Sequence, residues 1–248
     1  MKFAMRTCTG GRENNQDTAF FKAEILEIRD EERCDYTDNT CLIHGDEAGC
    51  HGCCSGSVVA AVFDGVGGHK HGFQAAYVAA KMMSEMSLPD LAVINRGVLA
   101  TGGASTVAGV QVQNGEAQIF WAGDSRVYLV RDDEIILLSR DDTELQVLVD
   151  ANMVSPIQVR RVSNGLTNCL GIPEQAFQEN RKPIDLQPAD RIILLTDGVW
   201  DPVEFDLGKT ILLGSLDEVD RNLCKALTQF GNNENSEMDN WSFLIIDV

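Results

Sequence analysis

Aspartates stand at the ends of five short apolar segments of this chain of 248 residues. The aspartates and the segments they border are Asp17 with 18–21, Asp64 with 58–63, Asp124 with 118–123, Asp197 with 191–196, and Asp239 with 241–246. If these segments are strands of alternating direction, carboxylates that follow some strands and precede others gather at one edge of a sheet. Close carboxylates repel each other by about 1 kcal/mol per pair even in water, and a pair of divalent cations removes that repulsion. Because all the ligands are oxygens, such a site favours Mg²⁺ or Mn²⁺ over zinc or copper.

The segment 58–72 indicates how one of these carboxylates is positioned. Six apolar residues rich in valine predict a strand buried on both faces, and the strand ends on Asp64. Glycines at 65, 67 and 68 then allow a ligand to approach the main chain closely. An ordinary Asp-Gly turn that closes a hairpin is the alternative for this segment alone. The repetition of strand-end aspartates along the chain favours the ion site.

Five short motifs follow one another between residues 12 and 242. They are Arg12-Glu13-Asn14-Asn15-Gln16-Asp17, Asp64-Gly65-Val66-Gly67-Gly68-His69, Gly123-Asp124-Ser125-Arg126, Asp197-Gly198-Val199-Trp200-Asp201 and Asp239-Asn240-Trp241-Ser242. In this order they make the chain resemble the metal-dependent protein phosphatases of the PPM, or type 2C, serine/threonine class, in particular the compact bacterial members. The resemblance implies an α+β fold: a four-layer α-β-β-α sandwich in which two mainly antiparallel sheets pack face to face with helices outside.

The resemblance also implies a role for each acidic residue of the motifs. The implied ligands are Asp64 as the bridge between two Mn²⁺ or Mg²⁺ ions, the Gly65 carbonyl on one ion, Asp197 and Asp239 on the other, Asp17 through water, and Asp124, Asp197 and Asp201 around a third, weaker ion. Arg12 and Asp64 are the residues implied to be catalytic. Arg12 would bind the substrate phosphate, for which a planar guanidinium offers two parallel donors.

The implied reaction is hydrolysis of a phosphoserine or phosphothreonine ester on a protein, without a phosphoenzyme intermediate. Two ions would lower the pKa of a bridging water and offset charge on the transferring phosphoryl group. Animal members carry a histidine directly after the Asp-Gly pair that corresponds to Asp64 and Gly65. Val66 stands there in this chain, so the sequence assigns no general acid.

Other phosphate chemistries fit the sequence less well. A cysteine-based phosphatase needs a thiolate under a backbone cradle with an arginine shortly after it, and no cysteine here has that context. A nucleotide-binding P-loop needs a Gly-Lys-Ser/Thr ending that the glycine-rich segment lacks. The serious alternative is a catalytically silent, metal-binding protein of the same fold that acts as a partner-binding module through its cysteine-rich insert.

Composition limits the partners and the location. The formal net charge of -18 speaks against nucleic acid and against anionic membrane surfaces. The first residues lack the apolar core of a signal peptide, and no run of about 18 apolar residues occurs, so we expect a cytoplasmic protein. We also expect a monomer that acts in signalling on a phosphorylated protein. Because the motifs must converge, we expect one catalytic domain over residues 1–248.

The remaining elements follow from periodicity. Helical spacing predicts helices at 72–86, 90–100, 143–152 and 217–230. We expect a turn around one cation at 197–201. The segment 139–188 is otherwise expected to form polar loops, and the resemblance makes it a flap that borders the active site.

The segment 30–57 is an insert relative to compact family members, and it contains five of the eight cysteines and two of the four histidines. We expect a polar loop that needs a covalent or metal staple. The candidate ligands of a structural zinc ion are Cys34, Cys41, His44, Cys50 and Cys53, with Cys50 and Cys53 as one pair and His44 with Cys34 or Cys41 as the other. Reduced thiols and disulfides are the alternatives, and the expected cytosolic location favours thiols or metal ligands over disulfides.

Overall fold

The computed structural model describes residues 1–66, 71–154, 165–203, 213–233 and 238–248, without the side chains of 30–32 and 232–233. Twelve strands and five helices lie in these ranges. The strands are β1 (Lys2–Cys8), β2 (Asp17–Glu32), β3 (Cys34–Thr37), β4 (Thr40–His44), β5 (Glu47–Asp64), β6 (Val107–Gln113), β7 (Glu116–Ala122), β8 (Arg126–Arg131), β9 (Glu134–Leu137), β10 (Asn180–Asp185), β11 (Arg191–Leu195) and β12 (Trp241–Asp247). The helices are α1 (Gly72–Glu85), α2 (Leu91–Leu99), α3 (Glu144–Asp150), α4 (Asp197–Val203) and α5 (Leu216–Asn233).

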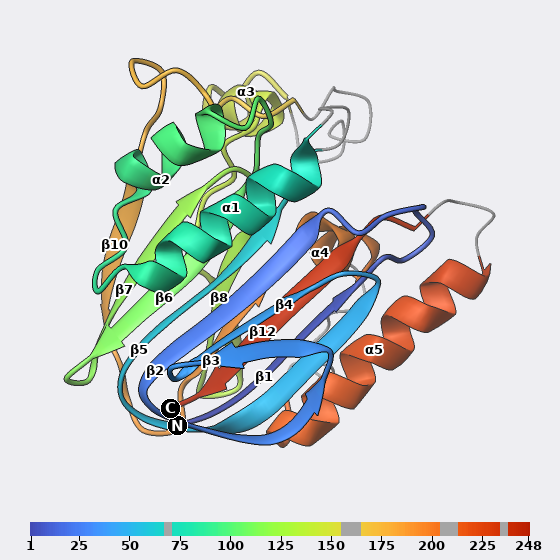
Figure 1. Cartoon of the computed structure of the whole chain (residues 1–248). Helices are drawn as coiled ribbons and strands as arrows, with labels where there is room; N and C mark the ends of the chain where they lie inside the picture. The colour runs from blue at the N-terminus through green and yellow to red at the C-terminus, as the bar shows by residue number, and fades with distance from the viewer. Residues whose placement is uncertain (67–70, 155–164, 204–212, 234–237) are drawn as a thin grey trace.

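The long antiparallel pair of β2 and β5 joins two antiparallel sheets into one hydrogen-bonded system (Figure 1). The first part of β5 pairs with β1, and the last part pairs with β6. Between these parts the pairing with β2 shifts register after Ala23, and Gly56 adopts a φ of 79°. Such a bulge bends a strand and increases its twist. The paired strands β2 and β5 therefore pass from one sheet to the other. The two sheets expected from the sequence share these longest strands.

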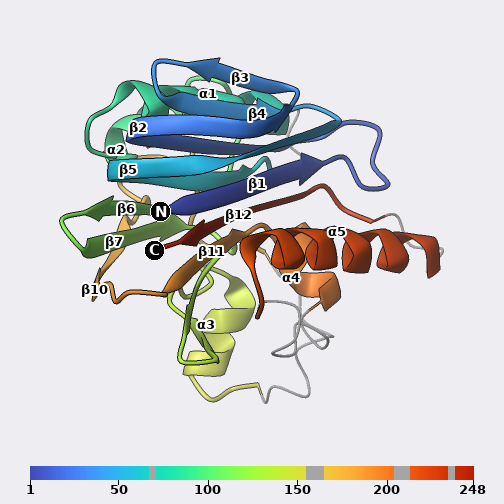
Figure 2. The same cartoon turned by 90° about the horizontal axis from the view of Figure 1, so that it is seen from below.

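Three separate apolar clusters give the molecule four layers (Figure 2). One cluster fills the space between the sheets, a second lies under α1 and α2, and a third lies under α4 and α5. Because side chains alternate between the two faces of a sheet, successive residues of a strand belong to different clusters. Phe21 faces the central cluster, and Phe20 faces the α1 side. The α-β-β-α sandwich predicted from the family resemblance is confirmed.

Most of the predicted helices lie where periodicity placed them. α2 begins after Asp90, whose side chain accepts a hydrogen bond from the Val93 amide. The prediction of a turn at 197–201 was wrong, because these residues form the first part of α4. β10 lies in the segment expected to be polar loops and pairs with β7 along the edge of a sheet. None of the helices in the described ranges has both the length and the apolar content needed to cross a bilayer.

The segment 30–57 is not the loop that the sequence predicted. It forms the end of β2, the hairpin of β3 and β4, and the start of β5. Cys41, Cys50 and Cys54 belong to the central apolar cluster. Buried cysteines act as small hydrophobic residues, so the segment has an apolar face that counting only large aliphatic side chains overlooks.

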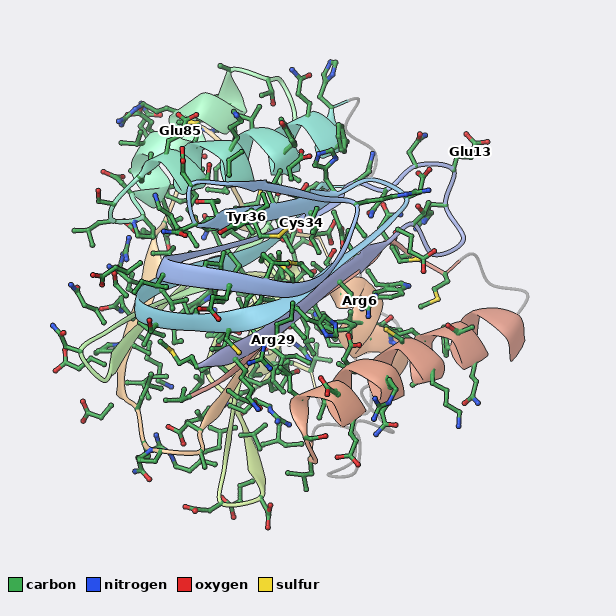
Figure 3. The ribbon with its side chains drawn as sticks, turned by 60° about the horizontal axis from the view of Figure 1, so that its bottom comes forward. Arg6, Glu13, Arg29, Cys34, Tyr36 and Glu85 are labelled. Carbon is green, nitrogen blue, oxygen red and sulfur yellow. A yellow bond between two sulfur atoms is a disulfide. The ribbon has the colours of Figure 1, made fainter. Side chains whose placement is uncertain are left out.

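The five-residue zinc site was wrong as predicted. Cys34 and Cys41 form a disulfide between β3 and β4. Cys50 and Cys53 lie three residues apart on one strand, so their side chains point to opposite faces. The His44 ring lies 3.2 Å from the Asp35 carboxylate. The expectation that thiols or metal ligands outweigh disulfides is therefore wrong for Cys34 and Cys41. Figure 3 labels Cys34 on the outer hairpin of β3 and β4.

Gly52, where β5 packs against β2 and β1, supplies a test of the sheet junction. A Cβ atom added at Gly52 would lie 2.3 Å from the Glu27 carbonyl and 2.6 Å from the Phe3 ring. We expect Gly52→Ala to lower the free energy of unfolding by about 1–3 kcal/mol, measured by urea denaturation. Gly165→Ala is the control, since its Cβ would meet its nearest atom at 3.4 Å. Equal stabilities of the two variants would contradict the close packing described for this junction.

Candidate active site

A cavity of about 790 Å³ opens at the edge of the sheets where the motif residues meet. The predicted site residues that line it are Arg12, Asp64, Gly65, Asp124, Asp197 and Asp239. They come from five parts of the chain: the loop between β1 and β2, the end of β5, the turn after β7, the junction of β11 with α4, and the segment that leads into β12. The expected gathering of strand-end carboxylates is thus observed.

Asp17 and Asp64 lie directly opposite each other in the register of β2 and β5. The Asp17 side chain is fully buried, and its Oδ2 accepts a hydrogen bond of 2.9 Å from the Thr196 hydroxyl. Its Oδ1 has no hydrogen-bond partner among the described residues. A buried carboxylate oxygen without a partner is costly, so this atom needs a proton, a water or a cation.

Asp64 and Asp197 are in direct contact through their side chains. Asp197 is the first residue of α4 and follows β11, so strand and helix together fix its position. Asp201 lies one helical turn further along α4, is exposed and adds to the negative potential at Asp197. The carboxylates expected around the ions are therefore close enough to act on one another electrostatically.

Asp239 lies at the rim of the cavity next to the predicted phosphate-binding residue. The Arg12 guanidinium contacts the Asp239 carboxylate at 2.8 Å, and both side chains are about half exposed, at 46% and 48%. This ion pair joins the loop before β2 to the segment before β12. It places a cation and a candidate metal ligand side by side at the cavity mouth.

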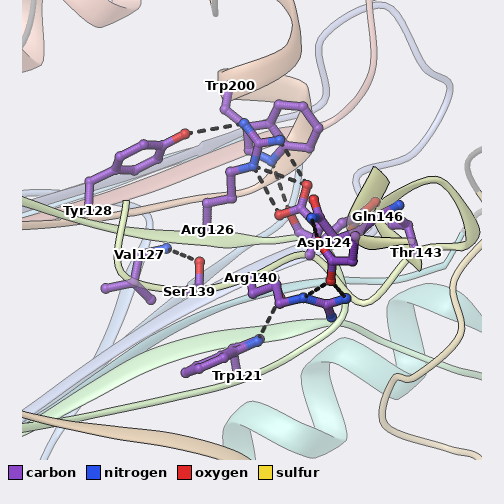
Figure 4. Close-up of polar contacts among 12 residues, drawn as sticks. Trp121, Asp124, Arg126, Val127, Tyr128, Ser139, Arg140, Thr143, Gln146 and Trp200 are labelled. Atoms are coloured by element: carbon purple, nitrogen blue, oxygen red, sulfur yellow. Dashed lines mark hydrogen bonds and ion pairs between the residues drawn. The ribbon is translucent and has the colours of Figure 1, made fainter. Parts of the chain in front are cut away.

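Asp124 is held by a network that reaches α4 (Figure 4). The Trp200 indole N–H donates a 3.0 Å hydrogen bond to the Asp124 carbonyl. The Arg126 guanidinium lies 3.5 Å from the centre of the Trp200 ring and pairs with Asp141 at 2.8 Å. A guanidinium stacked on an aromatic face and paired with a carboxylate is held rigidly. Asp124 and α4 are consequently fixed relative to each other.

Two supporting residues were not identified from the sequence. Thr196 donates to Asp17, as described above, and its hydroxyl also accepts from the Ser242 amide at 2.9 Å. Asn240 accepts from the Gln16 amide at 2.8 Å and donates to backbone carbonyls of the loop that carries Arg12. Each stands next to a motif aspartate in sequence, which is the one signal that could have indicated it.

Burial and mutual repulsion disfavour the charged form of these carboxyls. Burial is the first cause and neighbouring aspartates add to it, so the pKa of Asp17 rises to about 7 and the pKa of Asp124 to about 8. The pKa values of Asp64 and Asp197 are raised for the same reasons. A set of carboxylate oxygens with one buried oxygen unpartnered fits hard divalent cations, which would restore the charged forms.

The acidic cluster is wider than the shell of a single ion. In the described part of the chain, the one group of three metal-ligating side chains whose donor atoms lie within 4.8 Å of one another consists of cysteines, not of these aspartates. Ligands that cannot all reach one ion suit a pair of ions that share a bridging carboxylate.

The raised pKa of Asp17 predicts how the stability of the metal-free protein varies with pH. The folded state keeps its proton up to about pH 7, whereas the unfolded chain releases it near 3.8. The unfolded state thus binds fewer protons between these values, and the free energy of unfolding falls as the pH rises through this window. Asp17→Asn removes this titration and should flatten the fall, measured by urea denaturation in chelator at about pH 5 and about pH 8.

Glu134→Gln, an exposed change on β9, is the matched control and should keep the wild-type slope. If the free energy of unfolding of Asp17→Asn falls with pH as steeply as that of the wild type, the burial of the Asp17 carboxyl is not the source of this pH dependence.

No family model matches the chain. Among curated proteins it is similar to the serine/threonine protein phosphatase PstP of two Mycobacterium tuberculosis strains, with 26% identity over 175 residues, covering 60% of this chain. The chain spans 33% of the length of these relatives.

Solved structures share the fold over nearly the whole chain. The PPM Ser-Thr phosphatase MsPP from Mycobacterium smegmatis, in complex with cacodylate, has a TM-score of 0.68 at 22% identity, covering 99% of this chain and 97% of its own. The Mycobacterium tuberculosis phosphatase PstP/Ppp has a TM-score of 0.67 at 20% identity, covering 99% and 97%. The PstP catalytic domain in complex with two manganese ions has a TM-score of 0.65 at 19% identity, covering 100% and 99%. The chain therefore has the fold of the PPM serine/threonine phosphatases and resembles them in sequence, as its motifs predicted.

Proposed function

We propose that this protein hydrolyses phosphoserine or phosphothreonine esters on protein substrates with the help of two divalent ions, Mn²⁺ or Mg²⁺. The observation that carries the proposal is that Asp64 and Asp197 line one cavity, with the buried Asp17, whose Oδ1 has no hydrogen-bond partner among the described residues, directly opposite Asp64. The similarity to PstP, one structure of which contains two manganese ions, supports the choice of metal.

The ion ligands proposed are those implied by the motifs. They are Asp64 as the bridge, the Gly65 carbonyl, Asp197 and Asp239, with Asp17 acting through water and with Asp124, Asp197 and Asp201 around a third, weaker site. When bound, the ions supply a hydroxide near neutral pH and neutralise charge on the phosphoryl group. The chain's own part is to hold the carboxylates in place, which the opposed register of Asp17 and Asp64 and the position of Asp197 at the start of α4 favour, while the bound ions would keep them charged.

Arg12 would bind two phosphate oxygens of the substrate. Its guanidinium lines the cavity and lies beside Asp239, so a phosphate bound there would be adjacent to the ion ligands. The planar fork of donors orients the ester rather than only attracting its charge. Substrate binding would exchange part of the Arg12–Asp239 pairing for pairing with phosphate.

The segment 139–188 is proposed to shape the substrate end of the cavity. Gly165, Leu166, Cys169 and Ile172 line it, as does Arg12. We propose that residues 1–248 act as one catalytic domain, as a monomer in signalling. The net charge of -18 favours a neutral or cationic phosphoprotein surface over nucleic acid.

The alternative is a catalytically silent protein that binds metal and recruits a partner through segment 30–57. Every implied carboxylate ligand is present and lies at or beside the cavity, which favours the enzyme. The two functions differ in one simple result, because the silent protein releases no phosphate.

The direct test is release of phosphate from a phosphothreonine peptide. We expect Mn²⁺-dependent turnover by the wild type, its loss in chelator, and a rate lower by about 100-fold or more for Asp64→Asn, since that carboxylate contacts Asp197 at the centre of the charge cluster. Asp133→Asn, the same change at an exposed turn between β8 and β9, is the control and should retain the wild-type rate. Equal rates for Asp64→Asn and wild type, or no release by the wild type, would remove the proposal.

The Thr196 hydroxyl provides a second test, because it orients a carboxylate that would act through water. We expect Thr196→Val to raise the Mn²⁺ concentration needed for half-maximal activity by about 10- to 100-fold, the usual range for outer-sphere partners of metal ligands. Thr196→Ser keeps the hydroxyl and should stay near the wild-type value. If valine and serine behave alike, the hydrogen bond to Asp17 has no part in ion binding.

A further inference from the structure

Three cysteine sulfurs lie close together in the central apolar layer, away from the residues that line the acidic cavity. The Sγ atoms of Cys34, Cys41 and Cys50 all lie within 4.8 Å of one another. Each residue belongs to a different strand, β3, β4 and β5. The group therefore connects the outer hairpin to the long strand that enters the second sheet.

The surroundings of this three-sulfur cluster are apolar and rigid. Cys41 and Cys50 are fully buried within the central apolar cluster, and Cys34 packs against it while partly exposed. Cys41 lies opposite Phe21 on β2, and Cys50 lies opposite Met5 on β1. Because the strands are fixed by their ladders, the sulfurs cannot separate far when the disulfide between Cys34 and Cys41 is opened.

We propose that Cys34, Cys41 and Cys50 form a thiolate site for a d¹⁰ metal ion, Zn²⁺ or Cu⁺, once the Cys34–Cys41 disulfide is reduced. The reduction needs a thiol reductant: two reductant thiols give two electrons and two protons to the S–S bond and become a disulfide themselves. Metal binding then displaces the thiol protons, and the ion neutralises sulfur charges that the apolar surroundings would otherwise disfavour.

Geometry and ligand type favour such an ion. A Zn–S bond is about 2.3 Å, so sulfurs that share one ion with a third ligand lie about 4 Å apart. The three Sγ atoms lie within 4.8 Å of one another, and the sulfurs of Cys34 and Cys41 would move apart to this spacing once their bond is reduced. Thiolates select soft or borderline ions, whereas the carboxylates of the cavity select Mg²⁺ or Mn²⁺. Since Cys34 is partly exposed, water can complete the coordination from the open edge. This site is independent of the proposed phosphatase reaction.

The three sulfurs revise the ligand set inferred from the sequence. His44 and Cys53 drop out, the first because it contacts Asp35 and the second because it points to the other face of β5. The disulfide ties β3 to β4, whereas the ion would tie both strands to β5, so the pair β3–β4 keeps a crosslink in both redox states.

The experiment is a Co²⁺ titration of the full chain, reduced with a phosphine, stripped of metal and kept without oxygen. Co²⁺ reports thiolate ligands through a near-ultraviolet charge-transfer band that carboxylates do not give. We expect one equivalent of Co²⁺ per chain to produce the band, Zn²⁺ to displace it, and the oxidised protein to lack it. The Asp64→Asn variant should keep the band, which separates this site from the acidic cavity.

Serine variants identify the ligands. Cys50→Ser and Cys34→Ser should lose the band, whereas Cys53→Ser, the same change on the same strand as Cys50, should keep it. Circular dichroism checks that each variant is folded. If the buried Cys50→Ser variant does not fold, Cys34→Ser, at a half-buried position, provides the test. Absence of the band from the reduced wild type, or its persistence in folded Cys34→Ser or Cys50→Ser protein, would overturn the proposal.

Discussion

Repulsion between buried carboxylates is the constraint on which the rest of this structure depends. Asp17, Asp64, Asp124 and Asp197 lie so close together that burial and neighbouring charge raise the pKa of each. Such an arrangement is unfavourable by itself, because the charged forms lose hydration and repel one another. It becomes favourable when divalent cations share the oxygens. This is the physical reason for proposing that the site binds divalent ions.

The fold meets this constraint by fixing several of the carboxylates on strands and at the start of a helix. The antiparallel pair of β2 and β5 holds two carboxylates in opposed register and spans both sheets. The Trp200 and Arg126 stack ties α4 to the Asp124 segment. Since these supports come from different layers of the sandwich, the carboxylates cannot relax apart without disturbing the hydrophobic core. Two metal ions can be held at a fixed separation only if their carboxylate ligands are rigidly placed.

The sequence predicted the acidic site better than the rest of the molecule, for a physical reason. An aspartate at the end of an apolar run marks a sheet edge from local information alone, so Asp64 and Asp197 could be placed together. The roles of Thr196 and Asn240 depend on partners far along the chain, which no local pattern reveals. The segment 30–57 was misread as a loop because its buried face is made largely of cysteine and small residues. The junction between the sheets likewise depends on strand length and register, which periodicity does not determine.

Diffraction at the manganese absorption edge from crystals grown with Mn²⁺ tests the central claim most directly. The account predicts two anomalous peaks about 3.5–4 Å apart in the cavity, with Asp64 between them and Asp197 and Asp239 on one of them. Asp17 should lie behind these ligands, with a water between its carboxylate and an ion. Two peaks at these positions would support two manganese ions held by strand-end carboxylates. A cavity without manganese, or with ions bound away from Asp64, would contradict it.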